Sequence, residues 1–360
     1  MNASAAEKDP VVFPGQDWQT RTPEQAGMDG AKLAQFIELI SSDLQAAQPP
    51  LEEIRGCVIK DGYMVGSWGD PARRNGWFSA SKPVLSTLLF HAIDQGKLPG
   101  VDARIADLGW PLSDKDKTMT FRHLADMTGG YTLPEAPGTR WAYNDFGILL
   151  YAMSLEKVFG CTIQQKAQEF FGPLGLQDGS LIGKHLKGRG VATSPRDFAR
   201  VGWLWMNHGR WGSKQLLPAS YFEKYMHPDV PADLPRTAGC EPPDDYRQIT
   251  SYGGGNNQTD VGPGMYGFNW WFNAPGPDGK LPFPDAPRDL VMAVGYSGNI
   301  MVMLPSQRLL AVGRAHWGEV DLPRRARLNQ AIRLLVESVT ASAPASATTQ
   351  PVGCACCKSK

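Results

Sequence analysis

The sequence predicts an α+β fold, in which one antiparallel sheet is completed by both ends of the chain and a mostly helical lobe is inserted between them. Three observations lead to this prediction. Residues 54–68 have the pattern of a two-stranded hairpin, residues 85–225 follow a largely helical pattern, and residues 266–339 have the pattern of short strands that end in a helix. Sites tend to fall between two such lobes, so we expect a site at their junction.

A helix and a hairpin are predicted ahead of the helical block. The carboxylate of Asp29 can cap the helix, whose apolar residues recur at helical spacing. These residues are Leu33, Phe36, Ile37, Ile40 and Leu44. Residues 54–60 and 63–68 then have strand patterns on either side of Asp61-Gly62, a dipeptide that favours a tight hairpin turn.

The helical block begins with an apolar-periodic run that starts near Ser79 and continues to Ile93. Several of its helices have clear start and stop signals. Ser194 followed by Pro195 is typical of a helix start, and Gly160 is typical of a helix end. The sequence predicts further helices over residues 122–127, over 146–159 with Asp145 as the N-cap, over 163–172 and over 195–205.

A change of composition separates the helical block from the last strands. Residues 228–265 are rich in Pro, Gly, Asp and Asn and predict a long loop, a kind of segment that is often functional. Strands are then predicted over residues 266–272, 290–294, 300–304 and 309–313, followed by a helix over residues 323–339. Residues 340–360 are rich in Ala, Ser, Thr and Pro and predict a disordered tail.

The overall composition excludes several classes of function. The 360 residues include 36 Lys and Arg against 36 Asp and Glu, so nothing indicates a nucleic-acid-binding surface or a polybasic membrane anchor. No apolar run approaches the ~20 residues that are needed to span a bilayer. We therefore expect neither a nucleic-acid partner nor a membrane span, and the sequence leaves the oligomeric state open.

The two ends of the chain carry little further information. Cys354, Cys356 and Cys357 lie close together, but no second cysteine pair or nearby histidine completes a zinc site, and no nucleotide-binding glycine motif is present. We expect no metal and no other cofactor. Residues 1–22 are predicted to be irregular, and Ala3-Ser4-Ala5 resembles the small-residue end of a signal peptide without its apolar core. A periplasmic or secreted protein with its signal removed and a cytoplasmic protein both remain open.

The segment Ser79-Ala80-Ser81-Lys82 is the first candidate for catalysis. It holds a serine and a lysine three residues apart at the start of a helix, so both side chains lie on the same helical face. A lysine amine beside a serine hydroxyl can help to remove its proton, which prepares the oxygen for attack on an acyl carbon. This S-x-x-K spacing is the nucleophile motif of serine β-lactamases and penicillin-binding proteins, although by itself it is a weak signal.

Later segments make the chain resemble the class C β-lactamase-like serine hydrolases, which include β-lactamases, penicillin-binding proteins, esterases and 6-aminohexanoate-dimer hydrolases. About sixty residues after Ser79, Tyr143-Asn144-Asp145 resembles the Y-x-N segment of the family. The resemblance also covers residues 190–200, residues 266–271 and residues 293–298, the last at the place of the K-T-G strand. It extends over residues 17–338.

The resemblance implies a role for each matching residue. Ser79 would be the nucleophile, and Lys82 and Tyr143 would be its acid/base partners. The oxyanion hole would use the backbone N–H groups of Ser79 and Tyr296, with Gly295 supporting the site. The implied fold is the β-lactamase/transpeptidase-like one, with an α/β lobe at about residues 17–80 and 260–338 and a helical lobe at about residues 81–259.

Two departures from the family pattern affect these expectations. Asp145 stands where the family more usually has Asn, and it could serve as a helix N-cap alone or could also face Lys82. In the second case it would favour the protonated ammonium, and Tyr143 would have to be the principal base. Ala293-Val294 stands where β-lactamases carry Lys-Thr or a related polar pair, which favours neutral esters or amides over substrates with a carboxylate.

Aromatic residues near the last strands are candidates for substrate binding. Tyr252, Tyr266 and Trp270 could line an apolar acyl pocket, although packing within the core is the alternative for each of them. The two histidines that a Ser-His-Asp triad could use, His123 and His316, are predicted to be structural.

Three functions remain open after these observations. The favoured one is a serine hydrolase that cleaves a small-molecule carboxylic ester or amide through an acyl-enzyme on Ser79. The first alternative is a β-lactamase or D-Ala-D-Ala carboxypeptidase with the same nucleophile. The second is a catalytically silent member of the family that only binds a ligand. The sequence does not separate esters from amides, because the same nucleophile serves both.

Overall fold

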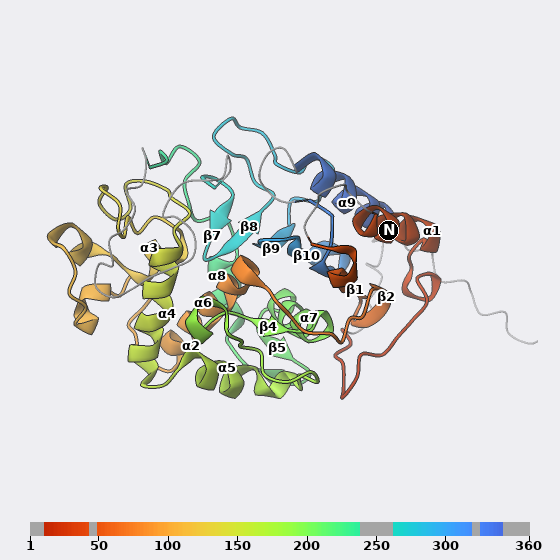
Figure 1. Cartoon of the computed structure of the whole chain (residues 1–360), viewed down its shortest axis with the longest axis horizontal. Coiled ribbons are helices and arrows are strands. Elements are labelled where there is room, and N and C mark those ends of the chain that lie inside the picture. The colour runs from red at the N-terminus through yellow and green to blue at the C-terminus, as the bar shows by residue number, and fades with distance from the viewer. Residues whose placement is uncertain (1–10, 43–48, 238–261, 319–324, 341–360) are drawn as a thin grey trace, which may run out of the picture.

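A single antiparallel sheet of seven strands joins the two ends of the domain (Figure 1). The structure is a computed structural model, and it describes residues 11–42, 49–237, 262–318 and 325–340. The strand order is β2-β1-β11-β10-β9-β8-β7. The N-terminal hairpin pairs with the last strand in the register Arg55 to Arg314 through Lys60 to Leu309, which confirms the predicted α+β fold.

The bounds of the elements agree closely with the sequence patterns. The strands of the large sheet are β1 (Arg55–Lys60), β2 (Tyr63–Trp68), β7 (Tyr266–Gly267), β8 (Trp270–Phe272), β9 (Val291–Gly295), β10 (Asn299–Leu304) and β11 (Leu309–Arg314). Two-residue strands form two small additional sheets, one from β3 (Asn75–Gly76) and β4 (Ala192–Thr193) and one from β5 (Arg210–Trp211) and β6 (Lys214–Gln215).

The helices of the described residues lie mostly between β2 and β7 in the chain. They are α1 (Gly30–Ser41), α2 (Lys82–Asp94), α3 (Phe121–Ala125), α4 (Asp145–Phe159), α5 (Ile163–Phe171), α6 (His185–Gly188), α7 (Pro195–Met206), α8 (Ala219–Tyr225) and α9 (Arg325–Glu337). Short 3₁₀ turns are η1 (Glu24–Ala26), η2 (Leu51–Glu53), η3 (Phe78–Ser81), η4 (Ile105–Leu108), η5 (Asp114–Thr118), η6 (Gly172–Leu174) and η8 (Pro305–Gln307).

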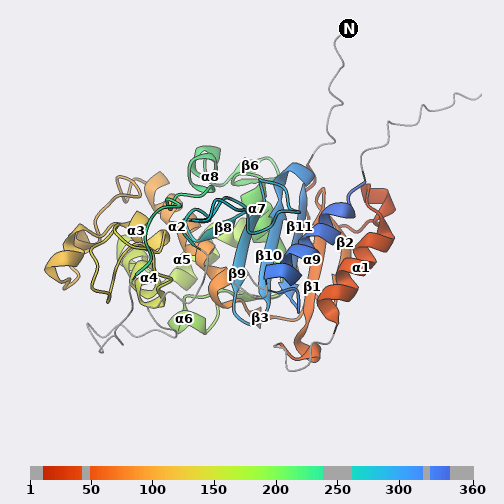
Figure 2. The same cartoon turned by 90° about the horizontal axis from the view of Figure 1, so that it is seen from above.

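Helices cover both faces of the sheet, which gives the α/β part three layers. Helices α1 and α9 pack against each other beside the β1–β2 end, and α7 packs against β1, β10 and β11 (Figure 2). The helix α7 approaches the sheet closely at Gly202, where a Cβ would overlap the side chain of Leu310. The helices α2, α3, α4 and α5 gather beyond the β7–β8 end of the sheet (Figure 1).

Local start and stop signals account for most helix ends. The Asp29 carboxylate accepts hydrogen bonds from the backbone N–H groups of Ala31 and Lys32, as predicted. Ser194 caps α7 ahead of Pro195, and Gly160 ends α4 in the left-handed conformation with a φ of 72°. No single helix in the described ranges is long and apolar enough to cross a membrane. The helix α4 and the segment formed by α5 and η6 meet the length and composition of a span only when taken together, and the two are bent by 72° relative to each other.

The structure corrects two local predictions. The predicted strand over residues 266–272 is a tight hairpin, because Phe268 and Asn269 adopt positive φ angles of 45° and 70° and reverse the chain between β7 and β8. The predicted cap of α4 is also wrong. Asn144 is the N-cap, with its side-chain oxygen accepting from the N–H of Gly147, and Asp145 is the first helical residue. The predicted tail and most of the predicted loop lie outside the described residues.

Candidate active site

Ser79 lies in the 3₁₀ turn η3, which leads directly into α2. Phe78, the residue before it, has a φ of 47°, a conformation that non-glycine residues adopt rarely and that often accompanies functional turns. Lys82 is the first residue of α2, so one turn of helical backbone separates it from Ser79. The Nζ atom of Lys82 lies 2.5 Å from the Oγ atom of Ser79.

The turn that carries Ser79 is anchored to the segment that precedes α7. The backbone N–H of Trp77 donates to the carbonyl oxygen of Val191 at 3.0 Å, and its indole N–H donates to that of Thr193 at 3.0 Å. In return, the N–H of Val191 donates to the Ser81 hydroxyl at 2.8 Å. The Trp77 ring is fully buried against Phe198, so the backbone beside the serine has little freedom to move.

Strand β9 reaches the same turn at its last residue, Gly295. A Cβ on Gly295 would overlap the carbonyl oxygen of Trp77 and would lie 2.8 Å from the N atom of Ala80 and 3.2 Å from that of Ser79. Only glycine therefore allows this approach. The close contact brings the chain that continues into Tyr296 beside the backbone N–H of Ser79.

Lys82 is the hub of the site, because its Nζ atom contacts three oxygen atoms. Besides Ser79, it lies 2.9 Å from the Oη atom of Tyr143 and 2.8 Å from the Oδ1 atom of Asp145. A lysine ammonium has three N–H donors, and these three oxygens can accept all of them. The side chain of Lys82 is only 6% exposed, so the contacts form away from bulk water.

The contacts of Lys82 keep its ammonium charged. Burial lowers the pKa of Lys82, but the opposing charge of Asp145, together with hydrogen bonds to Asp145 and Tyr143, outweighs burial and holds the pKa above its ordinary value. Neither of the two arrangements left open for Asp145 is therefore present in full: its carboxylate faces the lysine, but the residue does not cap the helix. A fully protonated amine has no lone pair with which to accept the serine proton.

Three other aromatic rings lie next to the ring of Tyr143. The ring of Trp271 stacks on it with centroids 6.2 Å apart and planes 20° apart, and Trp141 lies 6.3 Å away. Tyr266 is 6.5 Å away and fully buried, and burial raises the pKa of its hydroxyl well above the ordinary value, with the nearby Tyr143 adding to the rise. These contacts hold the Tyr143 ring in one orientation.

The predicted substrate-binding aromatics occupy different environments. Trp270 is fully buried and packs against Phe90 and Trp205, so its ring lies in the core rather than beside Ser79. Tyr266 is likewise buried and packs edge-to-face against Tyr143. Both residues therefore pack within the core, which was the alternative to lining an acyl pocket. Tyr252 lies outside the described residues.

The turn after β9 holds Tyr296 at the surface. Ser297 and Gly298 have positive φ angles of 61° and 69° and link β9 to β10. The buried side chain of Asn299 donates to the carbonyl oxygen of Tyr296 at 2.6 Å, and Arg314 donates to the Ser297 hydroxyl at 2.7 Å. These two side chains fix the backbone on either side of the turn.

Sequence patterns did not single out the residues that anchor this site. Val191, Thr193 and Asn299 act through backbone groups or through one side-chain amide, and no motif marks such contacts in a sequence. The Ser297-Gly298 pair between two strand patterns is the one local signal, because it favours a tight turn. An asparagine directly after that turn, such as Asn299, would then be a candidate for a side-chain hydrogen bond to a backbone carbonyl on the other side of the turn.

The two demoted histidines have structural contacts. The ring nitrogens of His316 lie 2.8 Å and 2.6 Å from the carbonyl oxygens of Ser42 and Pro49, and the ring is almost completely buried. His123 completes a capping box with Thr120 at the start of α3. Within the described part of the chain, no group of three or more His, Cys, Asp or Glu side chains could hold a metal ion.

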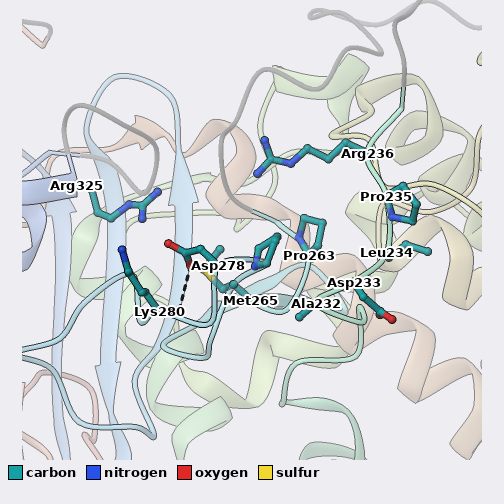
Figure 3. A pocket seen from close by; sticks show the side chains of 12 residues that line it. Ala232, Asp233, Leu234, Pro235, Arg236, Pro263, Met265, Asp278, Lys280 and Arg325 are labelled. Carbon is teal, nitrogen blue, oxygen red and sulfur yellow. Dashed lines mark hydrogen bonds between the residues drawn. The ribbon is translucent and has the colours of Figure 1, made fainter.

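A cavity of about 700 Å³ is formed by other residues than the candidate catalytic ones (Figure 3). Its walls come from the segments 232–236, 263–265 and 276–280, together with Arg325. Neither Ser79, Lys82 nor Tyr143 lines it. One wall is nevertheless tied to the site, because the backbone N–H of Trp141 donates to the carbonyl oxygen of Pro235 at 2.9 Å.

The fold is that of a class of serine hydrolases. Residues 57–335 match the family model described as Beta-lactamase, which covers more than half of the chain. The chain belongs to the β-lactamase family, a family of serine hydrolases. No curated protein matches the sequence significantly.

Several solved structures share the fold at low sequence identity. A penicillin-binding protein homologue from Caulobacter crescentus has a TM-score of 0.61 at 12% identity, with 86% of this chain and 97% of that chain covered. The hydrolase EstCE1, which has promiscuous acyltransferase activity, has a TM-score of 0.59 at 14% identity, with 84% and 99% covered. A β-lactamase/D-alanine carboxypeptidase from Yersinia pestis has a TM-score of 0.55 at 16% identity, with 79% and 92% covered.

Proposed function

We propose that this protein is a serine hydrolase that cleaves neutral carboxylic esters or amides through an acyl-enzyme on Ser79. One observation carries the proposal. The buried Nζ atom of Lys82 lies within hydrogen-bond distance of Ser79 Oγ, Tyr143 Oη and Asp145 Oδ1 at once. A nucleophile, a charged positioning group and a phenolic acid/base are thereby combined in one contact network.

In the proposed reaction, Tyr143 acts as a phenolate, stabilised by the Lys82 ammonium 2.9 Å away, and takes the serine proton. The Ser79 oxygen attacks the carbonyl carbon, and the charge that develops on the carbonyl oxygen accepts hydrogen bonds from the N–H groups of Ser79 and Tyr296. The bond to the leaving group then breaks, and Tyr143 passes the proton to the departing oxygen or nitrogen. Water attacks the acyl-enzyme while Tyr143 accepts one of its protons, and the proton returns to Ser79 as the acid is released.

Lys82 has a positioning role in this mechanism. Its ammonium donates to the oxygen atoms of both Ser79 and Tyr143 and stabilises negative charge on either of them during proton transfer. Asp145 keeps that ammonium charged through its contact at 2.8 Å. The oxyanion role of Tyr296 is supported by the glycine approach of β9, which brings the backbone after Gly295 next to the Ser79 amide.

The preference for neutral substrates rests on the residues at the end of β9. Ala293 and Val294 carry no charge in the place where a substrate carboxylate would need a cation. The basic side chain beside the following turn is Arg314, and its guanidinium is already paired with Glu53 and bonded to Ser297. A substrate carboxylate would have to compete with Glu53 for this cation.

The proposal is tested with three probes and a matched variant. The protein and its Ser79→Ala variant are incubated with p-nitrophenyl acetate, with nitrocefin and with a fluorophosphonate label. We expect ester turnover and labelling that both disappear in the variant. Ester turnover that persists in the variant would exclude Ser79 as the nucleophile.

The same experiment separates the two alternatives. Nitrocefin turnover far above ester turnover would favour a β-lactamase or D-Ala-D-Ala carboxypeptidase. Absence of both labelling and turnover would favour a catalytically silent member that only binds a ligand. Ser213→Ala, which changes an exposed serine in the turn between β5 and β6, is the matched control, and we expect it to retain fluorophosphonate labelling.

A further inference from the structure

The aromatic ring of Tyr296 is exposed beside the candidate nucleophile. Among the described residues, Tyr296 and Leu51 are the large apolar side chains that remain exposed, at 60% and 48% of their surface. Tyrosine combines a large apolar ring with few rotatable bonds, which suits it to contact a ligand at low entropic cost. Single exposed apolar residues are common on protein surfaces, so exposure alone does not indicate a binding role. The place of the ring relative to the candidate nucleophile is what indicates one.

The position of Tyr296 relates it directly to Ser79. Tyr296 follows Gly295, which lies against the backbone of the Ser79 turn. Its ring also contacts the ring of Phe78, the residue before Ser79, with centroids 5.8 Å apart and planes at 79°. The two rings therefore meet beside the turn that carries Ser79, one from the residue after β9 and one from η3, and the Tyr296 ring stays largely open to solvent.

The backbone that presents this ring is held in place. Asn299 is completely buried, donates to the carbonyl oxygen of Tyr296 at 2.6 Å and accepts from the side-chain amide of Asn75 at 2.9 Å. Arg314 holds the next residue, Ser297, through both its carbonyl and its hydroxyl oxygen. A ring on a fixed backbone loses little freedom when a ligand packs on it, so the contact is preorganised.

We propose that Tyr296, together with Phe78, is a specificity-determining residue that selects ester or amide substrates with a flat aromatic group next to the scissile bond. This inference rests on the proposed function, because it takes Ser79 as the reacting group. An aromatic ring packed on another gains stabilisation beyond its buried area, whereas a saturated ring of the same carbon number gains only the burial.

The test uses pairs of ester substrates in which one member carries an aromatic ring and the other the saturated ring with the same number of carbon atoms. Methyl phenylacetate and methyl cyclohexylacetate vary the acyl side, and benzyl acetate and cyclohexylmethyl acetate vary the alcohol side, with acid release followed by titration. We expect Tyr296→Ala to lower kcat/KM for the aromatic member of at least one pair by roughly 3- to 10-fold, and for its saturated partner by less than about 2-fold. Tyr296→Phe should restore the preference, and Leu51→Ala, the exposed control, should leave it unchanged.

Binding supplies a readout that does not depend on turnover. The Ser79→Ala protein is titrated with the same four esters by ligand-observed NMR, with and without Tyr296→Ala added, and we expect the aromatic preference to disappear with the tyrosine. An equal loss for both members of each pair, or no loss for any, would overturn the inference. Ester turnover that survives Ser79→Ala would instead contradict the proposed function, so the two failures are distinguishable.

Discussion

The carboxylate of Asp145 lies 2.8 Å from the ammonium of Lys82, and it does not fill the cap position that was expected for it. Asn144 caps α4 instead, which leaves Asp145 available for the lysine. The pair determines the charge of the group beside Ser79, because burial alone would lower the pKa of Lys82 and the contact with Asp145 reverses that effect.

Asp145→Asn tests which form of Lys82 is active. Removing the carboxylate lowers the pKa of Lys82, so the lysine loses its proton at a lower pH than in the unmodified protein. If the charged ammonium is required, the alkaline limb of the pH dependence of kcat/KM moves to lower pH. We expect this shift in profiles of ester hydrolysis, with Asp233→Asn, an exposed aspartate, as the control. A gain of activity at neutral pH would instead indicate that neutral Lys82 is the base.

Tyr143→Phe tests the identity of the general base. The variant keeps the ring that stacks on Trp271 and removes only the hydroxyl that contacts Lys82. Because positioned acid/base groups contribute on the order of 10²–10⁴ in rate, we expect kcat for ester hydrolysis to fall by a factor in that range. The melting temperature is measured alongside as a control for folding. Activity close to that of the unmodified protein would return the base role to Lys82.

Gly295→Ala tests the close approach of β9 to the nucleophile turn. The added methyl group would overlap the Trp77 carbonyl oxygen and crowd the Ser79 amide, so the strand or the turn must move. Such overpacking typically costs about 1–3 kcal/mol, and we expect a lower melting temperature together with reduced kcat. Gly100→Ala is the matched control, because a Cβ there meets no atom within 4 Å. Unchanged stability and turnover in Gly295→Ala would show that this approach is not required.

Asp126→Asn tests a buried carboxyl group beneath the β7–β8 hairpin. Burial raises the pKa of Asp126 well above its usual value, and the neighbouring Asp229, which bonds to it, raises it further. The side chain accepts from the N–H of Phe268 at 2.7 Å, and Arg122 lies 2.5 Å from Asp229. An amide retains the acceptor for Phe268 and a donor for Asp229, but it cannot ionise.

The sign of the pH effect follows from this raised pKa. The folded state binds the Asp126 proton more tightly than the unfolded state, so protonated Asp126 adds to the free energy of unfolding. This contribution is fully present below the pKa that Asp126 has in the unfolded state, and it is lost as pH rises through its pKa in the folded state. We therefore expect Asp126→Asn to gain melting temperature over the unmodified protein as pH increases, in scans from about pH 4 to about pH 9. A constant difference across this range would contradict the expectation.

The sequence by itself determined the features that depend on neighbouring residues. Hydrophobic periodicity and turn residues located the hairpin at residues 55–68 and the helices α1, α4 and α7, because helix and strand periods are properties of the local backbone. The pairing of Ser79 with Lys82 is of the same kind, since residues three apart at a helix start share one face. The hairpin within residues 266–272 was not predicted, because a run of aromatic residues has the pattern of one continuous strand. The positive φ angles of Phe268 and Asn269, which reverse the chain there, are not indicated by the residue types in this run.

Only the tertiary structure decided which groups meet across long stretches of chain. Whether Asp145 capped a helix or faced a lysine 63 positions earlier could not be read locally, because an aspartate is chemically suited to both. The anchoring of Trp77 by Val191 and Thr193, and the approach of Gly295 to Ser79, arise from packing of β9 and α7 around the same turn. Burial in that packing is also what makes the charge on Lys82 depend on Asp145, since water would otherwise screen the contact.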